Sequence, residues 1–325
     1  MRVPLVSVII CSYNGKDRIK RAIQSVLNQT MSDFELVVID DGSIESIEDT
    51  VRECSDNRIR FFRSGKNRGL HATRKWGVEL SKGEFIAILD DDDEWVADKL
   101  EKQIRQILSA HEVGLVCGGA IDYYPDGVKM LRLPPGFRIS YKRELVEECT
   151  IASSVLFRRS VYESVGGFDS SLRRCGDWDC WIRVARCSEI RCLLEPIVHT
   201  HMRRDSLQRS PDIEGFGADR WRVLEKHADE LTRLNLWHKA VSRHYHSIGV
   251  RYLRSGNFVE AQRCLQRALN EDLNLDTLLA WVAARFHLPE ASWERRALRR
   301  IKTEARKYGI TLLSKIDFGK VRESD

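Results

Sequence analysis

The sequence predicts an α/β fold in which a doubly wound, mostly parallel sheet is followed by an all-α C-terminal region. Within the first 90 residues, continuous apolar runs alternate with stretches of helical spacing, which is typical of parallel strands covered by helices on both faces. Beyond about residue 218 the spacing is helical and few strand signals remain. We therefore expect two domains in this chain of 325 residues, 1–217 and 218–325.

The elements of the first domain follow one another in a β-α-β order. Each expected strand is a short apolar run bounded by turn residues, and each expected helix has apolar residues three or four positions apart. The strands are residues 5–10, 34–39, 59–62 and 85–89, and the helices between them lie at 17–28, near 47–54 and at 69–81. Further helices are expected at 98–110 and from 158 and 176, with one or two strands at 113–124.

Four consecutive aspartates, Asp90 to Asp93, stand where the strand at 85–89 stops. Adjacent carboxylates repel one another, and a hard divalent cation is the usual partner for such a group of oxygens. A solvated acidic loop without a ligand is the alternative interpretation. The position at a strand end favours the cation, because open α/β sheets bind their ligands there.

Polar residues also follow two other expected strands, as Ser12-Tyr13-Asn14 and as Asp40-Asp41. All three groups should meet at one edge of a parallel sheet and suit a nucleotide. No G-x-G-x-x-G follows the first strand and no G-x-x-x-x-G-K-[ST] is present. Dehydrogenase-type dinucleotide binding and P-loop chemistry are therefore not expected.

Cysteine usage and hydropathy indicate the compartment. The nine cysteines form no C-x-x-C pair, which favours a reducing cytoplasm over a disulfide framework or a zinc site. Four of them recur at regular spacing and are interpreted as packing residues: Cys175, Cys180, Cys187 and Cys192. No apolar run approaches the roughly 20 residues that span a bilayer, and the apolar N-terminus is expected to be the first strand rather than a signal peptide.

The C-terminal region contains two recognisable segments. Residues 246–270 resemble a single tetratricopeptide-like helical hairpin that turns at 255–258. Residues 290–308 predict a basic amphipathic helix, either lying on an anionic membrane surface or solvated on the outside of the domain. The basic excess of the chain lies beyond residue 218, but the motifs of nucleic-acid binders are missing, so no nucleic-acid partner is expected.

Six motifs, in order over about residues 5–205, resemble those of family-2-type inverting glycosyltransferases with the GT-A fold. Each motif is weak alone, and together they indicate the family rather than the substrate. They are VSVIICSYN (6–14), ELVVIDDGS (35–43), NRG (67–69) with Arg74, GEFIAILDDDDEW (83–95), RR (158–159) with GGFD (166–169), and DWDCWIR (177–183).

The resemblance implies roles in holding a nucleotide-sugar donor. Tyr13 would lie against the base, Asp41 would bind the base edge and Asp90 the ribose, while Asp92 would coordinate Mg²⁺ or Mn²⁺. Four aspartates allow more than one D-x-D, and we prefer the pair Asp90 and Asp92. The expected donor-binding residues are Ser12, Tyr13, Asn14, Asp41, Asn67, Arg74, Asp90 and Asp91.

The resemblance also implies a catalytic base, Asp177, which would take the proton of the acceptor hydroxyl. Capping of the helix that begins there is the alternative role for Asp177, and Asp179 is the second choice for the base. Family members often carry Glu or Gln just before the base, where this chain has Cys175-Gly176. His201 is either a contact to the metal or diphosphate or a surface histidine.

The sequence thus favours a metal-dependent inverting hexosyltransferase of the cytoplasm, which is peripheral on the cytoplasmic membrane face if the basic helix binds the membrane. UDP is the preferred nucleotide, with GDP or dTDP as alternatives, and a glycan or lipid-linked hydroxyl is the expected acceptor. A catalytically inactive nucleotide-sugar-binding scaffold that recruits partners through its helices is the alternative. A nucleotidyltransferase is disfavoured because no Gly-rich basic loop follows the first strand.

Overall fold

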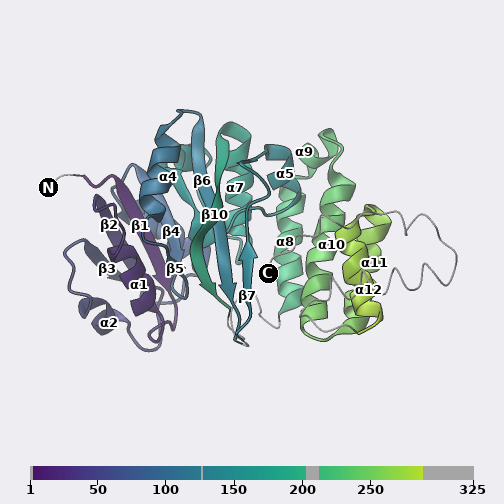
Figure 1. The fold of residues 1–325 in the computed structure, drawn as a ribbon, viewed down its shortest axis with the longest axis horizontal. Coiled ribbons are helices and arrows are strands. Elements are labelled where there is room, and N and C mark those ends of the chain that lie inside the picture. Colours follow the sequence, from purple (N-terminus) through teal and green to yellow (C-terminus); the bar gives the residue numbers. More distant parts are fainter. Residues whose placement is uncertain (1–2, 126, 203–211, 288–325) are drawn as a thin grey trace. The chain divides into compact units, whose positions relative to one another are not determined.

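The protein is described by a computed structural model that covers residues 3–125, 127–202 and 212–287 (Figure 1). The chain divides into two compact units. The N-terminal unit is Met1–Ser210 with Glu225–His227, and the C-terminal unit is Pro211–Leu224 with Ala228–Asp325. The basic helix expected at 290–308 lies outside the described residues.

One mixed sheet of ten strands forms the centre of the N-terminal unit, in the order β3-β2-β1-β4-β9-β6-β10-β5, with β7 beside β6 and β8 beside β10. The strands β1 to β4 pair in parallel, as expected, and so do β6 and β10. The antiparallel pairs all involve one of four short strands, β5, β7, β8 and β9. The bounds are β1 Val6–Ser12, β2 Phe34–Asp40, β3 Ile59–Arg63, β4 Phe85–Asp90, β5 Glu94–Trp95, β6 Val113–Tyr123, β7 Lys129–Arg132, β8 Arg138–Ile139, β9 Leu156–Arg158 and β10 Glu189–His201. The expected α/β class is confirmed.

Helices cover both faces of this sheet, because successive side chains of a strand point to opposite faces. Val8 and Ile10 of β1 pack with α1 and α4 in one apolar cluster. Ile9 packs in a second cluster with side chains of α3, α6 and α7. The helices of this unit are α1 Ile19–Leu27, α2 Glu48–Arg52, α3 Leu70–Leu80, α4 Lys99–Leu108, α5 Tyr141–Val146, α6 Arg159–Ser164 and α7 Gly176–Cys187, with a 3₁₀ turn, η1, at Ala152–Ser154.

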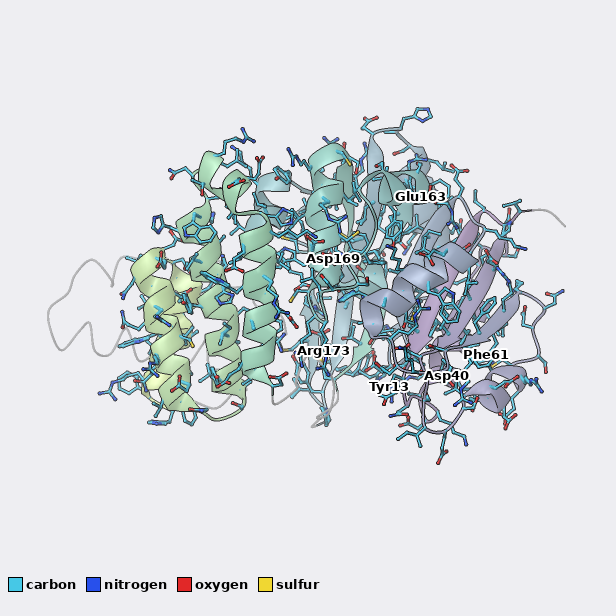
Figure 2. The ribbon with its side chains drawn as sticks, turned by 180° about the vertical axis from the view of Figure 1, so that it is seen from behind. Tyr13, Asp40, Phe61, Glu163, Asp169 and Arg173 are labelled. Atoms are coloured by element: carbon cyan, nitrogen blue, oxygen red, sulfur yellow. The ribbon has the colours of Figure 1, made fainter. Side chains whose placement is uncertain are left out.

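The carboxyl ends of three neighbouring strands lie side by side. In the register of the sheet, Ser12 of β1 is opposite Asp40 of β2, and Cys11 is opposite Asp90 of β4. Figure 2 shows Tyr13 and Asp40 at the same end of the sheet. The expected meeting of polar strand ends at one edge is therefore confirmed, and the candidate site lies there.

The C-terminal unit is helical throughout its described residues, in agreement with the expectation from sequence. Its helices are α8 Ile213–Lys226, α9 Ala228–Arg233, α10 Trp237–Arg254, α11 Phe258–Glu271 and α12 Leu275–Arg285. The expected hairpin is formed by α10 and α11, and it turns through Gly256, whose φ of 79° is accessible to glycine. At Gly249 a Cβ atom would lie 2.6 Å from Cγ of Leu265, so glycine lets the two helices approach closely.

All nine cysteines are free. Cys175, Cys180 and Cys192 are buried, as expected of packing residues, but Cys187 is exposed at the last position of α7. The packing interpretation is therefore wrong for Cys187, because the helix end turns its side chain outward. No helix in the described ranges is long and apolar enough to cross a membrane.

Candidate functional site

Arg74 lies at the centre of the candidate site and joins two of the predicted aspartates. Its side chain is 1% exposed. Nη2 lies 2.5 Å from Oδ1 of Asp90, at the end of β4. Nη1 lies 3.6 Å from Oδ2 of Asp177, in the first turn of α7. Three residues that are far apart in the sequence are thus brought together, and a buried guanidinium balances two carboxylates.

The helix that carries Arg74 begins beside the end of β2. Both carboxylate oxygens of Asp41 accept hydrogen bonds there, from the backbone N–H groups of Arg68 at 2.9 Å and Gly69 at 3.0 Å. Gly69 has a φ of 90°, which favours glycine. A carboxylate at a helix start is stabilised by the free N–H groups and the helix dipole. Asp41 therefore orders the start of α3, and its contact with a nucleotide base stays a prediction.

The loop after β1 is tied to the acidic run by Asp91. Oδ1 of Asp91 accepts from Nε of Arg18 at 2.8 Å, and Oδ2 accepts from the hydroxyl of Ser12. Gly15 is required here, because a Cβ atom would overlap both Asp91 and Ser12. Burial raises the pKa of Asp91, and the contacts with Arg18 and Ser12 oppose the rise. Ser12 and Asp91 are thus part of the framework of the site.

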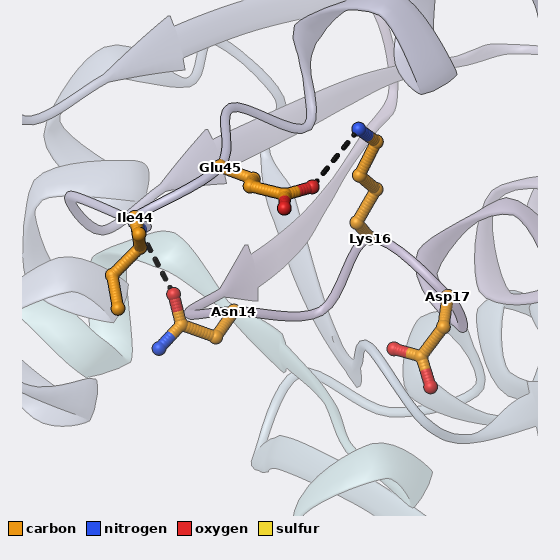
Figure 3. A pocket seen from close by; sticks show the side chains of 5 residues that line it. All are labelled: Asn14, Lys16, Asp17, Ile44 and Glu45. Carbon is orange, nitrogen blue, oxygen red and sulfur yellow. Dashed lines mark hydrogen bonds and ion pairs between the residues drawn. The ribbon is translucent and has the colours of Figure 1, made fainter.

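Tyr13 and Asn14 border the open side of this loop. The side chain of Tyr13 is 46% exposed. Asn14 has a φ of 52°, and its Oδ1 accepts the backbone N–H of Ile44 at 2.9 Å. Figure 3 shows this bond beside the ion pair of Lys16 and Glu45, in a pocket of about 480 Å³ that Asp17 also lines. The pocket is open to a ligand at the edge of the sheet.

A further predicted donor-binding residue, Asn67, is exposed on the loop that leads to α3. Gly42, in the loop after β2, has a φ of 74°, and a Cβ atom there would lie 2.7 Å from the backbone nitrogen of Asn67. The two loops therefore touch through backbone atoms. This places Asn67 on the same side of the sheet edge as Asp41.

Asp92 and Asp93 have different surroundings. Oδ2 of Asp93 accepts from the hydroxyl of Ser153 at 2.5 Å, and burial raises its pKa well above the usual range. Asp92 is half-buried and forms no side-chain ion pair among the described residues, although the charge of Arg18 acts on it. Burial, followed by the charges of Asp90 and Asp91, raises the pKa of Asp92 to about 6. A carboxylate in this position gains from a divalent cation.

His201, at the end of β10, is held by Glu94 rather than by an aspartate. Its Nε2 lies 2.6 Å from Oε1 of Glu94, and that oxygen also lies 3.1 Å from Nε of Arg21. The ring of Tyr123 stacks on His201 with centroids 5.2 Å apart. Within the described ranges, no three carboxylate, imidazole or thiol groups converge as a complete metal cage. Magnesium sites often use one or two carboxylates together with substrate phosphates, so the donor set fits such an ion.

Asp177 and Asp179 have separate partners, although they are two positions apart. Oδ1 of Asp177 accepts the backbone N–H of Trp178 at 3.0 Å, so this oxygen does cap the helix, while Oδ2 faces Arg74. Asp179 is fully buried and pairs with Arg183 at 2.7 Å. Burial alone would raise the pKa of Asp179, but hydrogen bonds from His227 and Arg183 lower it to about 2. The geometry makes Asp179 a structural residue and leaves Asp177 at the site.

Four residues of the site were not expected from sequence: Arg18, His71, Glu94 and Ser153. His71 is 2% exposed, and its Nε2 accepts the backbone N–H of Gly176 at 3.1 Å. Ser153 also binds the backbone N–H of Asp90 at 3.2 Å. Only Glu94 could have been found from the sequence, because it directly follows the four aspartates. The others make contacts over 60 to 105 positions, and no local pattern reports such contacts.

Known proteins resemble this chain in sequence. The model of the glycosyl transferase family 2 matches residues 7–166. The Escherichia coli protein UDP-Glc:alpha-D-GlcNAc-diphosphoundecaprenol beta-1,3-glucosyltransferase WfgD is 42% identical over 104 residues, which are 32% of this chain and 41% of that protein. In three of four such curated relatives, the match covers less than two thirds of the relative's own length, with a range of 41% to 84%.

Solved structures resemble this chain in fold over most of its length. S. aureus TarS 1-349 in complex with UDP-GlcNAc aligns with a TM-score of 0.57 at 16% identity, covering 87% of this chain and 92% of that one. The mannosyltransferase PcManGT from Pyrobaculum calidifontis, in complex with GDP-Man and Mn²⁺, aligns with a TM-score of 0.56 at 18% identity, covering 98% and 89%. At these identities the likeness concerns the fold.

Proposed function

Because residues 7–166 of this chain are a glycosyl transferase family 2 domain, we propose that the protein is a metal-dependent inverting glycosyltransferase. It transfers a sugar from a nucleoside-diphosphate sugar to a hydroxyl group of a glycan or a lipid-linked acceptor. The observation that carries the proposal is the convergence of Asp90 and Asp177 on the buried guanidinium of Arg74, at the carboxyl edge of the sheet. Ligands of open α/β sheets bind at this edge.

Inversion needs one displacement at the anomeric carbon and a base for the acceptor. Asp177 takes the proton of the acceptor hydroxyl while the oxygen of that hydroxyl forms a bond to the anomeric carbon. The bond from that carbon to the diphosphate oxygen breaks, and its electron pair leaves with the diphosphate. Arg74 holds the base in place through Oδ2, which faces the guanidinium at 3.6 Å.

Asp92 is the residue proposed to bind Mg²⁺ or Mn²⁺, with Asp90 beside it and His201 as a further candidate. Support comes from the chemistry of the donors, since carboxylate oxygens suit hard cations. Burial and the charges of Asp90 and Asp91 also raise the pKa of Asp92, and the charge of Arg18 offsets this only in part. The cation supplies Lewis-acid stabilisation of the departing diphosphate. The similar mannosyltransferase structure contains Mn²⁺.

The nucleotide is proposed to bind across the loops that follow β1 and β2. Tyr13 lies against the base, Asp41 and Asn67 bind its edge, and Asp90 binds the ribose. UDP is the preferred nucleotide, because the names of the WfgD relative and the TarS complex both refer to UDP-sugars. GDP is the alternative suggested by the complex with GDP-Man.

The acceptor is proposed to be a glycan or a sugar carried on a lipid diphosphate. The WfgD relative is named for an acceptor of that second kind. An enzyme with such a substrate works at a membrane surface, so we propose peripheral attachment to the cytoplasmic face. Flotation with vesicles that contain anionic phospholipids tests the attachment, and failure to float would contradict it.

Calorimetry with UDP, GDP, dTDP and CMP, each with and without Mn²⁺, tests the donor half of the proposal. We expect tight binding of one nucleoside diphosphate only when Mn²⁺ is present. The chemical half is tested by release of UDP from UDP-glucose and UDP-GlcNAc, with water as the acceptor. Metal-dependent binding without any release would indicate an inactive scaffold, and no metal-dependent binding would reject the transferase.

A further inference from the structure

His71 occupies a place between the two elements that carry the candidate base and its guanidinium partner. It lies on α3 three positions before Arg74, so both side chains project from the same face of that helix. His71 is 2% exposed and Arg74 is 1% exposed. Nε2 of His71 accepts the backbone N–H of Gly176, the first residue of α7, at 3.1 Å. The next residue of α7 is Asp177.

This bond satisfies the N–H of Gly176, whereas the cap that α7 supplies itself, Oδ1 of Asp177, binds the N–H of Trp178. The first N–H groups of a helix have no partner within the helix. Cys175, directly before α7, has a φ of 59°, and its side chain does not cap the helix. An imidazole from α3 therefore satisfies one of these N–H groups and fixes the first turn of α7 relative to α3.

Gly176 is the residue that makes room for this imidazole. A Cβ atom at position 176 would lie 2.7 Å from Cδ2 and 2.8 Å from Cγ of the His71 ring. Any residue with a side chain would displace either the ring or the start of α7. Gly176 and His71 thus form one contact unit, although they are 105 positions apart.

The hydrogen bond also defines the state of the ring. Because Nε2 accepts, the proton of the neutral imidazole is assigned to Nδ1, which is buried and has no partner among the described residues. A protonated ring would point a second N–H at the N–H of Gly176. Burial, which is the largest cause, and the charge of Arg74 lower the pKa of His71 to about 4, against the attraction of Asp177, Asp90 and Asp179. His71 thus remains an acceptor at neutral pH.

We propose that His71 is a positioning residue for Asp177: it holds the start of α7 so that the carboxylate faces the acceptor hydroxyl and Arg74. The inference rests on the proposed function, since Asp177 is the base of that reaction. A misplacement of about 1 Å at a reacting group costs up to roughly 100-fold in rate. The role of His71 is therefore expected to appear in kcat rather than in donor affinity.

Two substitutions distinguish the effect of the acceptor atom of His71 from the effect of the volume of its ring. His71→Leu fills similar space without an acceptor, and His71→Gln places an amide oxygen near the position of Nε2. We expect His71→Leu to lower kcat for UDP release from UDP-glucose by about 10- to 100-fold with the Kd for UDP and Mn²⁺ changed by less than about twofold. His71→Gln should recover most of the rate and keep the pH profile of the wild type. His244→Leu removes another buried histidine, 4% exposed and in the C-terminal unit, and serves as the control.

Hydrogen exchange in residues 172–180 provides a readout that does not depend on turnover. His71→Leu should increase exchange there, whereas His71→Gln should not. Equal kcat values for His71→Leu and the wild type, or equal losses in His71→Leu and His71→Gln, would overturn the proposal. If the wild type binds UDP with Mn²⁺ but releases none from any donor, the proposed function fails, and unchanged exchange in His71→Leu would separately reject the role of His71.

Discussion

Nη1 of Arg74 lies 3.6 Å from Oδ2 of Asp177, so the residue proposed as the base faces a buried positive charge. The same guanidinium lies 2.5 Å from Asp90. The proposed donor-binding group and the proposed base are therefore coupled through one side chain. A change at Arg74 should affect stability, donor binding and turnover together.

Replacing Arg74 by methionine is expected to lower the free energy of unfolding by about 3–5 kcal/mol, because it leaves two carboxylates without their buried partner. Urea unfolding at neutral pH measures this loss. Arg52→Met is the matched control: Arg52 pairs with Glu48 on the surface of α2, with its side chain 74% exposed, and should cost no more than about 1 kcal/mol. Equal losses in the two variants would contradict the central place of Arg74.

Replacing Asp92 by asparagine is expected to abolish the effect of Mn²⁺ on UDP binding, because the amide keeps the size of the carboxylate but not its charge. The Kd for UDP with Mn²⁺ should rise at least about tenfold, a loss of roughly 1.4 kcal/mol. Calorimetry measures it, with Asp49→Asn on the exposed surface of α2 as the control. Retention of metal-dependent binding in Asp92→Asn would place the metal on other residues.

Replacing Asp177 by asparagine is expected to leave UDP binding within about twofold and to lower UDP release by about 100-fold or more, the usual range for a missing general base. Asp179→Asn serves for comparison. It should instead lower the free energy of unfolding, because it removes the buried partner of Arg183. A normal release rate in a folded Asp177→Asn protein would reject Asp177 as the base.

Replacing Tyr13 by alanine is expected to raise the Kd for UDP about tenfold, because stacking of a base on an aromatic ring contributes roughly 1–3 kcal/mol. Binding of pyrophosphate with Mn²⁺, which has no base, should not change. Stability should not change either, since Tyr13 is 46% exposed. A similar loss for UDP and pyrophosphate would mean that Tyr13 acts through the loop rather than on the base.

The free energy of unfolding should decrease as the pH is lowered from 6.5 to 4, and His71 should account for part of this decrease. Its pKa is about 4 in the folded protein and about 6.5 for an imidazole in water, so the unfolded chain binds more protons in this window. The free energy of unfolding therefore decreases as the pH falls, by up to about 3 kcal/mol from this residue. Urea unfolding at pH 7 and pH 4 should show a smaller decrease for His71→Gln. The same decrease in both proteins would contradict the lowered pKa.

The residues at the carboxyl edge of the sheet could be predicted, because their position follows from the local sequence pattern. Apolar runs that end in Ser12, Asp40 and Asp90 indicate parallel strands, and parallel strands place these ends together. The α/β class and the helical hairpin of α10 and α11 follow from hydrophobic period in the same way. The short antiparallel strand β9, Leu156–Arg158, has only three residues, too few to show a period.

The contacts inside the site could not be predicted because they join distant positions. Arg18 and Asp91 are 73 residues apart, and His71 and Gly176 are 105 apart. From the sequence, Gly176 could be recognised only as a difference from the glycosyltransferases that the chain resembles. Its cause, an imidazole from another helix, appears only when α3 and α7 pack together.

The register of β2, β1 and β4 has a consequence for the size of the donor. Asp41 follows β2 and Asp90 ends β4, the two strands on either side of β1, and neighbouring strands lie about 4.8 Å apart. The two ends of the site are thus separated by two strand spacings, roughly 10 Å, and the backbone of the sheet fixes this length. Substitutions can change which group of the donor binds at each end of the site. The distance between the two ends is set by the backbone, so the sheet selects donors by their length.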